Sequence, residues 1–214
     1  MEKTLKKFTY CFVDFDKTIY DCAQLEVKMW QIFNKYAVKH EDYSATYHAA
    51  LKTRDPFLYD YTFEEQLEFL AKLGYKLPKE ILVELYQILD CNYLFPQVQE
   101  LLNNLKKISQ KVVLLTAGDQ GFQNYKIKIC GVEKMVDEVA IVDGDKDKYL
   151  LSRQIKPETV LFINDSKREN LLIKETFPAI TILAHTSKHV AELTQEGIIC
   201  FATIEEMNNY VGKL

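Results

Sequence analysis

The chain has 214 residues, of which 48% are hydrophobic and 27% are charged, and its formal net charge is −4 at pH 7. This composition fits one globular domain, or a core domain with a smaller insertion, and offers no basic surface for nucleic acid. The five cysteines include no Cys-x-x-Cys pair, which is typical of reduced thiols. The first apolar run ends at Asp14, too soon for a signal peptide or a membrane span. We therefore expect a cytoplasmic protein, a monomer or a homodimer, with no membrane or nucleic-acid partner.

The first expected element is a buried strand over residues 8–13, which carries Phe, Tyr, Cys and Val. Two carboxylates and a hydroxyl follow it directly, at Asp14, Asp16 and Thr18. Just past a strand end, the i, i+2 spacing points both carboxylates at one small volume, where a cation can sit between them. The alternative is that Asp16 or Thr18 only caps a turn after the strand. Polar residues at the ends of later strands favour the first interpretation.

Helical periodicity then replaces the strand pattern. Apolar residues recur at helical spacing from Leu25 to Tyr36, and further helices are expected over residues 43–51, 62–73 and 77–91. Thr62 and Glu65 form a capping box at the start of the third helix. Residues 21–93 are therefore predicted to form a small all-helical domain that interrupts the chain after its first strand. We expect its tyrosines to serve in packing, although a pocket-lining role stays open.

From residue 94 helices and strands alternate to the end of the chain. This alternation predicts an α/β fold with a Rossmann-like parallel sheet and right-handed crossovers. The predicted core domain covers residues 1–20 and 94–214. Strands are expected at 111–116, 138–142, 159–164, 179–184 and 198–201, and helices at 97–108, 120–130, 148–155, 166–177, 187–196 and from 204.

Two of these later strands also end in polar residues. Thr116 ends one strand and Asp165 follows another, and both ends meet the first acidic pair if the first strand is central. Carboxylates at close range need a compensating cation, and Mg²⁺ suits few carboxylates with waters and phosphate oxygens. Thr116 and the backbone N–H groups of Ala117 and Gly118, near a helix start, suit a phosphate.

These residues, in this order, resemble the motifs of the haloacid dehalogenase-like (HAD) superfamily, whose members are mostly Mg²⁺-dependent phosphatases. The first motif, Asp-x-Asp-x-Thr/Val, matches residues 14–18, with Lys17 in place of the usual Gly. The second motif matches the strand that ends at Thr116, and the fourth matches Asp165 with Glu169, after Asn164. The helical insertion is similar to the cap domain of the family.

The resemblance implies a phosphatase that acts on a small phosphorylated metabolite through an aspartyl-phosphate on Asp14. Asp16 would protonate the leaving oxygen and then activate water. Mg²⁺ would be held by Asp14, Asp165 and the backbone carbonyl of Asp16, with Glu169 in the outer shell. Thr116 and a lysine would bind the transferring phosphoryl group. Thr18, Ala117, Gly118 and Arg54 are the further candidate substrate contacts.

The lysine of the third motif lies near a helix start, which leaves a choice between Lys146 and Lys148. If the helix covers residues 148–155, Lys148 shares an inward face with Leu151 and Ile155, whereas Lys146 precedes the helix. We therefore predict Lys148 as the catalytic lysine.

Two rival functions remain open at this point. A phosphomutase or phosphotransferase shares the covalent half-reaction and differs only in the acceptor. A non-catalytic protein that binds a phospho-ligand or a partner is a rival from another class, and the intact acids argue against it.

Overall fold

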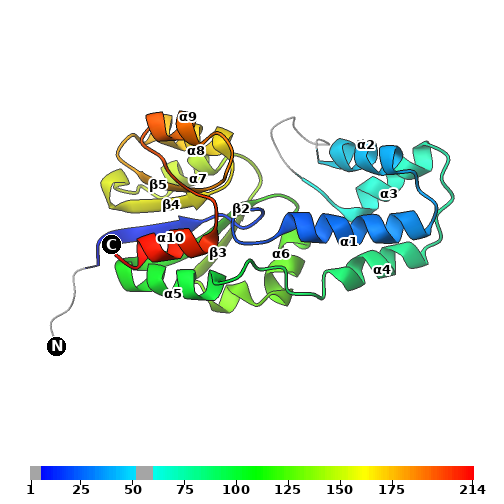
Figure 1. Ribbon diagram of the computed structural model, residues 1–214, viewed down its shortest axis with the longest axis horizontal. Helices are drawn as coiled ribbons and strands as arrows, with labels where there is room; N and C mark the ends of the chain where they lie inside the picture. Colours follow the sequence, from blue (N-terminus) through cyan, green and yellow to red (C-terminus); the bar gives the residue numbers. More distant parts are fainter. Residues whose placement is uncertain (1–5, 52–59) are drawn as a thin grey trace.

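The computed structural model describes residues 6–51 and 60–214 and contains a six-stranded parallel sheet with helices on both faces (Figure 1). The sheet order is β3-β2-β1-β4-β5-β6, so β1 lies in the centre. This topology confirms the predicted Rossmann-like α/β class. The strands are β1 (Phe8–Val13), β2 (Ser109–Ala117), β3 (Glu138–Val142), β4 (Val160–Asn164), β5 (Thr181–His185) and β6 (Ile199–Phe201).

The helices fall into two groups. In the described part of residues 21–93, four helices follow β1 with no strand between them, and we call them the helical module: α1 (Cys22–Lys35), α2 (His40–Ala50), α3 (Phe63–Lys72) and α4 (Glu80–Ile88). The others connect the strands: α5 (Val98–Ile108), α6 (Gln120–Ile129), α7 (Lys146–Ser152), α8 (Lys167–Thr176), α9 (Val190–Gln195) and α10 (Ile204–Val211). Two single 3-10 turns, η1 (Val132–Lys134) and η2 (Pro157–Thr159), precede β3 and β4.

Strand alternation divides the core of the sheet between its two faces. Cys11 and Val13 of β1 belong to the hydrophobic cluster that includes α5 and α10, whereas Phe12 belongs to the cluster on α7, α8 and α9. Side chains alternate between faces along a strand. The residue after Val13 is therefore set to point, like Phe12, toward the side of α7 and α8.

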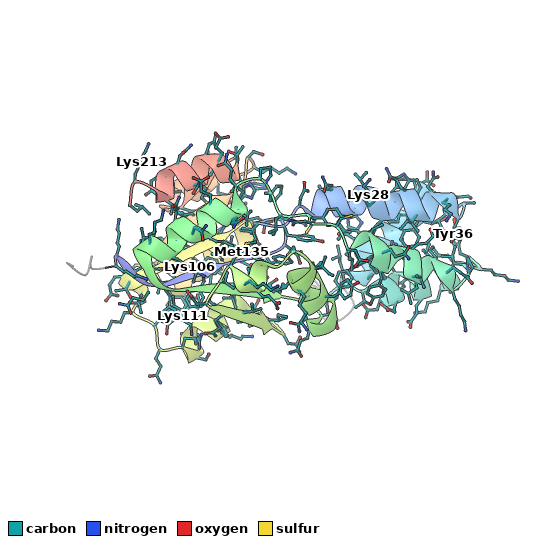
Figure 2. All side chains as sticks on the ribbon, turned by 90° about the horizontal axis from the view of Figure 1, so that it is seen from below. Lys28, Tyr36, Lys106, Lys111, Met135 and Lys213 are labelled. Atoms are coloured by element: carbon teal, nitrogen blue, oxygen red, sulfur yellow. The ribbon has the colours of Figure 1, made fainter. Side chains whose placement is uncertain are left out.

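The helical module lies beyond the end of β1, at one end of the long axis of the molecule (Figure 1). Figure 2 shows Lys28 and Tyr36 on this module, at a distance from Lys106 and Lys111 of the sheet region. The outgoing and returning chain segments are hydrogen-bonded to each other, because Asp21 N donates to Tyr93 O at 2.7 Å. The carboxyl end of the central strand therefore faces the module. No helix in the described part of the chain is long and apolar enough to cross a membrane.

One predicted element is displaced along the chain. The helix expected over residues 148–155 is α7, which begins at Lys146 and ends at Ser152. Gly144 turns the chain at φ 137° and Asp145 caps the helix in an extended conformation, so the first helical residue is Lys146. Gln154, at φ 49°, lies in the left-handed region that stops a helix. This shift decides which lysine faces the site.

Candidate active site

The register of the sheet gathers the predicted acids at one edge. Val13 pairs with Leu114 on one side and with Ile163 on the other. The residues that follow these positions lie at the carboxyl ends of three neighbouring strands, where ligands bind in open α/β sheets. Asp14, Thr116 and Asp165 therefore share this edge, as predicted.

Asp14 is the buried centre of a network of hydrogen bonds. The residue is only 4% exposed, and its Oδ1 accepts a bond of 2.7 Å from Lys146 Nζ. Its Oδ2 accepts a bond of 2.6 Å from the Thr18 hydroxyl. Lys146 also donates to Glu169 Oε2 at 2.8 Å, and the Asn164 amide donates to that same oxygen at 2.9 Å. The ammonium of Lys146 is thus shared by two carboxylates.

Thr18 connects the first motif to Asp165. Its side chain is fully buried, and its hydroxyl oxygen accepts a bond of 2.9 Å from the backbone N–H of Asp165. The backbone carbonyl of Thr18 accepts a bond of 2.7 Å from His185 Nδ1. Thr18 was predicted to contact substrate, but its hydroxyl is used within the protein. The structure corrects that assignment, because Thr18 positions Asp14 and Asp165.

The side chain of Asp16 points away from the Asp14 network. Lys126 Nζ donates to its Oδ1 at 2.5 Å, and Gln123 Nε2 donates to its Oδ2 at 2.7 Å. Cys22 Sγ donates to Oδ1 at 3.3 Å. Asp14 and Asp16 share no hydrogen-bond partner among the described residues, and the prediction that both carboxylates face one small volume stays a prediction.

The reason that the two carboxylates have different partners lies in the backbone after β1. The strand ends at Val13, and the alternation that the prediction assumed does not continue past Asp14. The chain then turns tightly, with an isolated bridge between Asp16 and Tyr20 and with Lys17 in the left-handed region at φ 61°. Glycine adopts such a φ without strain, whereas a lysine there is uncommon.

The structure also corrects the choice of lysine. Lys148 was predicted to bind the phosphoryl group, but its side chain is 76% exposed and its ammonium lies 3.5 Å from Asp145. Lys146 is 4% exposed and contacts Asp14. Because α7 begins two residues earlier than expected, its inward face carries Lys146 and Leu150. The helical spacing used for the prediction is valid, but the prediction assumed that the helix begins at residue 148.

Burial and neighbouring charges shift the pKa values of Asp14 and Lys146. Burial raises the pKa of the Asp14 carboxyl above its ordinary value, against the opposing charge of Lys146. Burial alone would lower the pKa of Lys146, but the charges of Asp14 and Glu169 outweigh it and raise that pKa. Lys146 is therefore held as an ammonium ion beside Asp14.

The pKa values of Asp165 and Asp16 shift in opposite directions. Burial and the charge of Asp14 raise the pKa of Asp165 to about 7. Burial also acts to raise the pKa of Asp16, but the charge of Lys126 and the hydrogen bonds from Gln123, Lys126 and Cys22 lower it overall. The lowered pKa favours the ionised form of Asp16, whereas the raised pKa of Asp165 disfavours its ionised form.

The connection from β2 to α6 offers backbone donors beside Thr116. Thr116 is buried, Ala117 is the last residue of β2, and Gly118 turns the chain at φ 134°. Asp119 caps α6 by accepting a bond of 2.7 Å from Phe122 N. Of the predicted phosphate contacts, Ala117 therefore ends the strand and Gly118 lies in the turn, so both precede the helix.

The helical module contributes aromatic side chains on the side of Asp16. Tyr61 and Phe63 contact the ring of Phe122, with ring centroids 5.6 and 5.1 Å apart. Tyr47 packs against Tyr61 at 5.2 Å. Arg54, predicted as a substrate contact, lies outside the described residues, as do Lys52 and Tyr59.

The donors of this edge fit a hard divalent cation. The Thr18 hydroxyl is hydrogen-bonded to both Asp14 and Asp165, and the charge of Asp14 contributes to the raised pKa of Asp165. No group of three or more His, Cys, Asp or Glu side chains in residues 6–51 and 60–214 is arranged to hold a metal ion. Mg²⁺ is bound in proteins by one or two carboxylates with waters and substrate oxygens, so two carboxylates match its needs.

Sequence reasoning missed the residues that hold Asp16. Gln123 and Lys126 lie on the buried side of α6, each with 4% exposure, beside Phe122. A lysine four residues after a buried aromatic, on the apolar face of a helix, is a signal that could have been read. His185, which bonds to Thr18, gave no such signal because it lies at the end of a strand.

Comparisons with known proteins agree with this geometry. The family model of haloacid dehalogenase-like hydrolases matches residues 8–172. No curated protein sequence matches the chain. Among solved structures, the magnesium-bound HAD-hydrolase YfnB from Bacillus subtilis is similar at 16% identity and a TM-score of 0.64, covering 96% of this chain and 99% of that one.

Two further structures show the range of similar proteins. A candidate β-phosphoglucomutase from Thermotoga maritima has 20% identity and a TM-score of 0.66, covering 96% of this chain and 99% of that one. The L-2-haloacid dehalogenase from Xanthobacter autotrophicus, with chloropropionic acid covalently bound, has 14% identity and a TM-score of 0.62, covering 95% and 98%. At these identities the structures share the fold. The match to the family model over most of the chain shows that this protein belongs to the haloacid dehalogenase-like hydrolase family.

Proposed function

We propose that this hydrolase is an Mg²⁺-dependent phosphatase that acts on a small phosphorylated metabolite through an aspartyl-phosphate on Asp14. The observation that carries the proposal is the buried contact of 2.7 Å between Asp14 and Lys146, with Asp165 close by. A carboxylate beside a fixed ammonium suits a nucleophile that must approach an anionic phosphoryl group.

The proposed reaction has two steps. A carboxylate oxygen of Asp14 attacks phosphorus and the bond to the leaving oxygen breaks. Asp16, ionised in the free protein, takes a proton from the bound phosphate monoanion and passes it to the leaving oxygen. In the second step Asp16 takes a proton from water, which attacks phosphorus and releases Asp14. Lys146, Thr116 and the N–H groups of Ala117 and Gly118 offset the charge on the phosphoryl oxygens.

Asp14, Asp165 and the backbone carbonyl of Asp16 are the proposed ligands of the cation. When bound, Mg²⁺ would neutralise charge on the carboxylates and the phosphoryl oxygens. Glu169 is proposed to stay out of direct contact, because its Oε2 already accepts bonds from Lys146 and Asn164. The magnesium in the similar Bacillus subtilis structure supports this choice of ion.

A phosphatase fits this site better than a dehalogenase. A haloacid carries a negative charge, and Asp14 and Asp165 lie on the same edge with the Thr18 hydroxyl bonded to both. A bound divalent cation would offset the repulsion between those carboxylates and the negative charge of a phosphate ester. We further propose that the protein acts in the cytoplasm as a monomer or homodimer, without a nucleic-acid partner.

The proposal is tested with para-nitrophenyl phosphate and 2-chloropropionate as substrates, each assayed with Mg²⁺ and after treatment with EDTA. We expect release of phosphate with Mg²⁺, loss of that activity in EDTA and its return when Mg²⁺ is added back. Release of chloride, or phosphate release that survives rigorous removal of metal, would contradict the proposal.

A further inference from the structure

Helix α6 carries two buried polar side chains that the proposed reaction does not use. Lys126 and Gln123 are each 4% exposed, and both donate to the carboxylate of Asp16. A buried ammonium is unusual unless it is paired. Lys126 forms an ion pair with Asp16, so the burial of this lysine is tied to that carboxylate.

The contacts take up both oxygens of Asp16. Lys126 Nζ lies 2.5 Å from Oδ1, and the rings of Phe15, Tyr20 and Phe122 surround the same ammonium at 5.4, 5.1 and 5.3 Å. These rings limit the positions that the lysine can adopt, because a cation is attracted to ring faces. Lys126 is thus a fixed donor for Asp16.

Gln123 donates to the second carboxylate oxygen of Asp16, and its own side-chain carbonyl is left without a partner among the described residues. Its Nε2 donates to Asp16 Oδ2 at 2.7 Å and to Ala117 O at 3.2 Å, while its Oε1 is buried with no hydrogen-bond partner among the described residues. The reversed amide would place Oε1 against two other oxygens, so the orientation is determined. The orientation of the amide therefore satisfies the Asp16 carboxylate and leaves the amide oxygen of Gln123 unsatisfied.

We propose that Lys126 and Gln123 are positioning residues that hold the Asp16 carboxylate where it can reach the leaving oxygen of the substrate. This inference rests on the proposed function, since it assigns Asp16 its role there. The helix that carries both residues also contacts Tyr61 and Phe63 through Phe122, on the side of the helical module. Asp16 is therefore held on the side from which a leaving group would depart toward the module.

The test compares an ester with a poor leaving group, n-butyl phosphate, with one that has a good leaving group, para-nitrophenyl phosphate. The variants are Lys126→Met, Gln123→Leu and the matched control Lys128→Met, an exposed lysine on the same helix. Proton donation matters most when the leaving group is poor, so we expect Lys126→Met to lower kcat at least about 10-fold on n-butyl phosphate. We expect a loss of less than about threefold on para-nitrophenyl phosphate, with KM little changed.

A double-mutant cycle checks that Lys126 acts through Asp16. The double variant Asp16→Asn/Lys126→Met should be no slower than Asp16→Asn alone, because the group being positioned is already gone. Additive losses, equal losses on the two esters, or a faster Lys126→Met would overturn the inference. If Lys126→Met does not fold, Gln123→Leu is measured against the same criteria.

One outcome separates this inference from the proposed function. If the wild-type protein hydrolyses neither ester, the proposed phosphatase activity is wrong. Crystal structures of the wild type and of Lys126→Met then decide the positioning claim. An Asp16 side chain that leaves its wild-type place supports it, and one that keeps the same place overturns it.

Discussion

The ammonium of Lys146 lies 2.7 Å from Oδ1 of Asp14 and is itself 4% exposed, although the two residues are 132 positions apart in the sequence. This contact joins the central strand to the start of α7. It places a fixed positive charge beside the proposed nucleophile, and it is made by Lys146 and not by Lys148.

Replacing each of these two lysines by alanine should have very different effects on kcat. We expect Lys146→Ala to lower kcat by about 100-fold or more, because a buried charge that stabilises the transferring phosphoryl group is lost. Lys148→Ala should change kcat less than about twofold, because that side chain is exposed and pairs only weakly with a surface carboxylate. Steady-state kinetics on para-nitrophenyl phosphate measures both, and the reverse order would restore Lys148 as the lysine of the site.

Asp14→Asn should abolish turnover and leave the fold intact. The amide has nearly the shape of the carboxylate but is a poor nucleophile, so we expect a loss of about 10⁴-fold or more in kcat. Lys146 keeps its bond to Glu169 in this variant, which limits the damage to the buried network. Circular dichroism and thermal unfolding serve as the control for folding. Retention of most of the wild-type rate would show that Asp14 is not the nucleophile.

The raised pKa of Asp165, about 7 in the folded protein against an ordinary 3.8, makes the metal-free protein sensitive to pH. A carboxyl that holds its proton more tightly in the folded state stabilises the fold at low pH, and this contribution is lost as pH rises toward and through 7. Asp165→Asn carries no such charge. In EDTA at about pH 8 we expect this variant to have a Tm higher than the wild type by about 2–4 °C, with the difference vanishing near pH 4.

Mg²⁺ provides the control for that experiment. Saturating Mg²⁺ should raise the Tm of the wild type more than that of Asp165→Asn, because the ion stabilises only the state that binds it. The same slope of Tm against pH for both proteins in EDTA would contradict the assignment of Asp165.

The position of the helical module predicts a size limit on substrates. The module faces the carboxyl ends of the strands (Figure 1). Its aromatic residues Tyr61 and Phe63 contact Phe122 of α6, the helix that also bonds to Asp16. If the module covers the site, we expect it to admit a small ester but not a folded protein or a duplex. We expect kcat/KM for free phosphoserine to exceed that for a phosphoserine within a folded protein by about 100-fold or more. Faster turnover of the protein would disprove the covered site, and a short phosphopeptide separates size from sequence.

The sheet could be predicted because each strand carries its own signal. Alternation of buried strands and helices is local information, and β1 and β4 end directly before acids. The edge that unites Asp14, Thr116 and Asp165 follows from topology alone. The placement of these three residues could be predicted for that reason, and their roles stay predictions.

The directions of single side chains could not be predicted in the same way. The orientation of Asp16 depends on a turn in which Lys17 adopts φ 61°, and the identity of the inward lysine depends on where α7 begins. A shift of two residues turns a helical side chain by more than half a turn. The partners of Asp16 lie on α6, more than 100 positions away, and only tertiary packing brings them together.

The covalent step on Asp14 can be measured directly. The enzyme is mixed with para-nitrophenyl phosphate and Mg²⁺, quenched in acid during turnover and reduced with borohydride, which converts an aspartyl-phosphate to homoserine. Peptide mass spectrometry then locates the reduced residue, with Asp14→Asn as the control. We predict homoserine at position 14 in the wild type alone. Turnover of the ester with Asp14 unreduced, or reduction at another aspartate, would contradict the central claim.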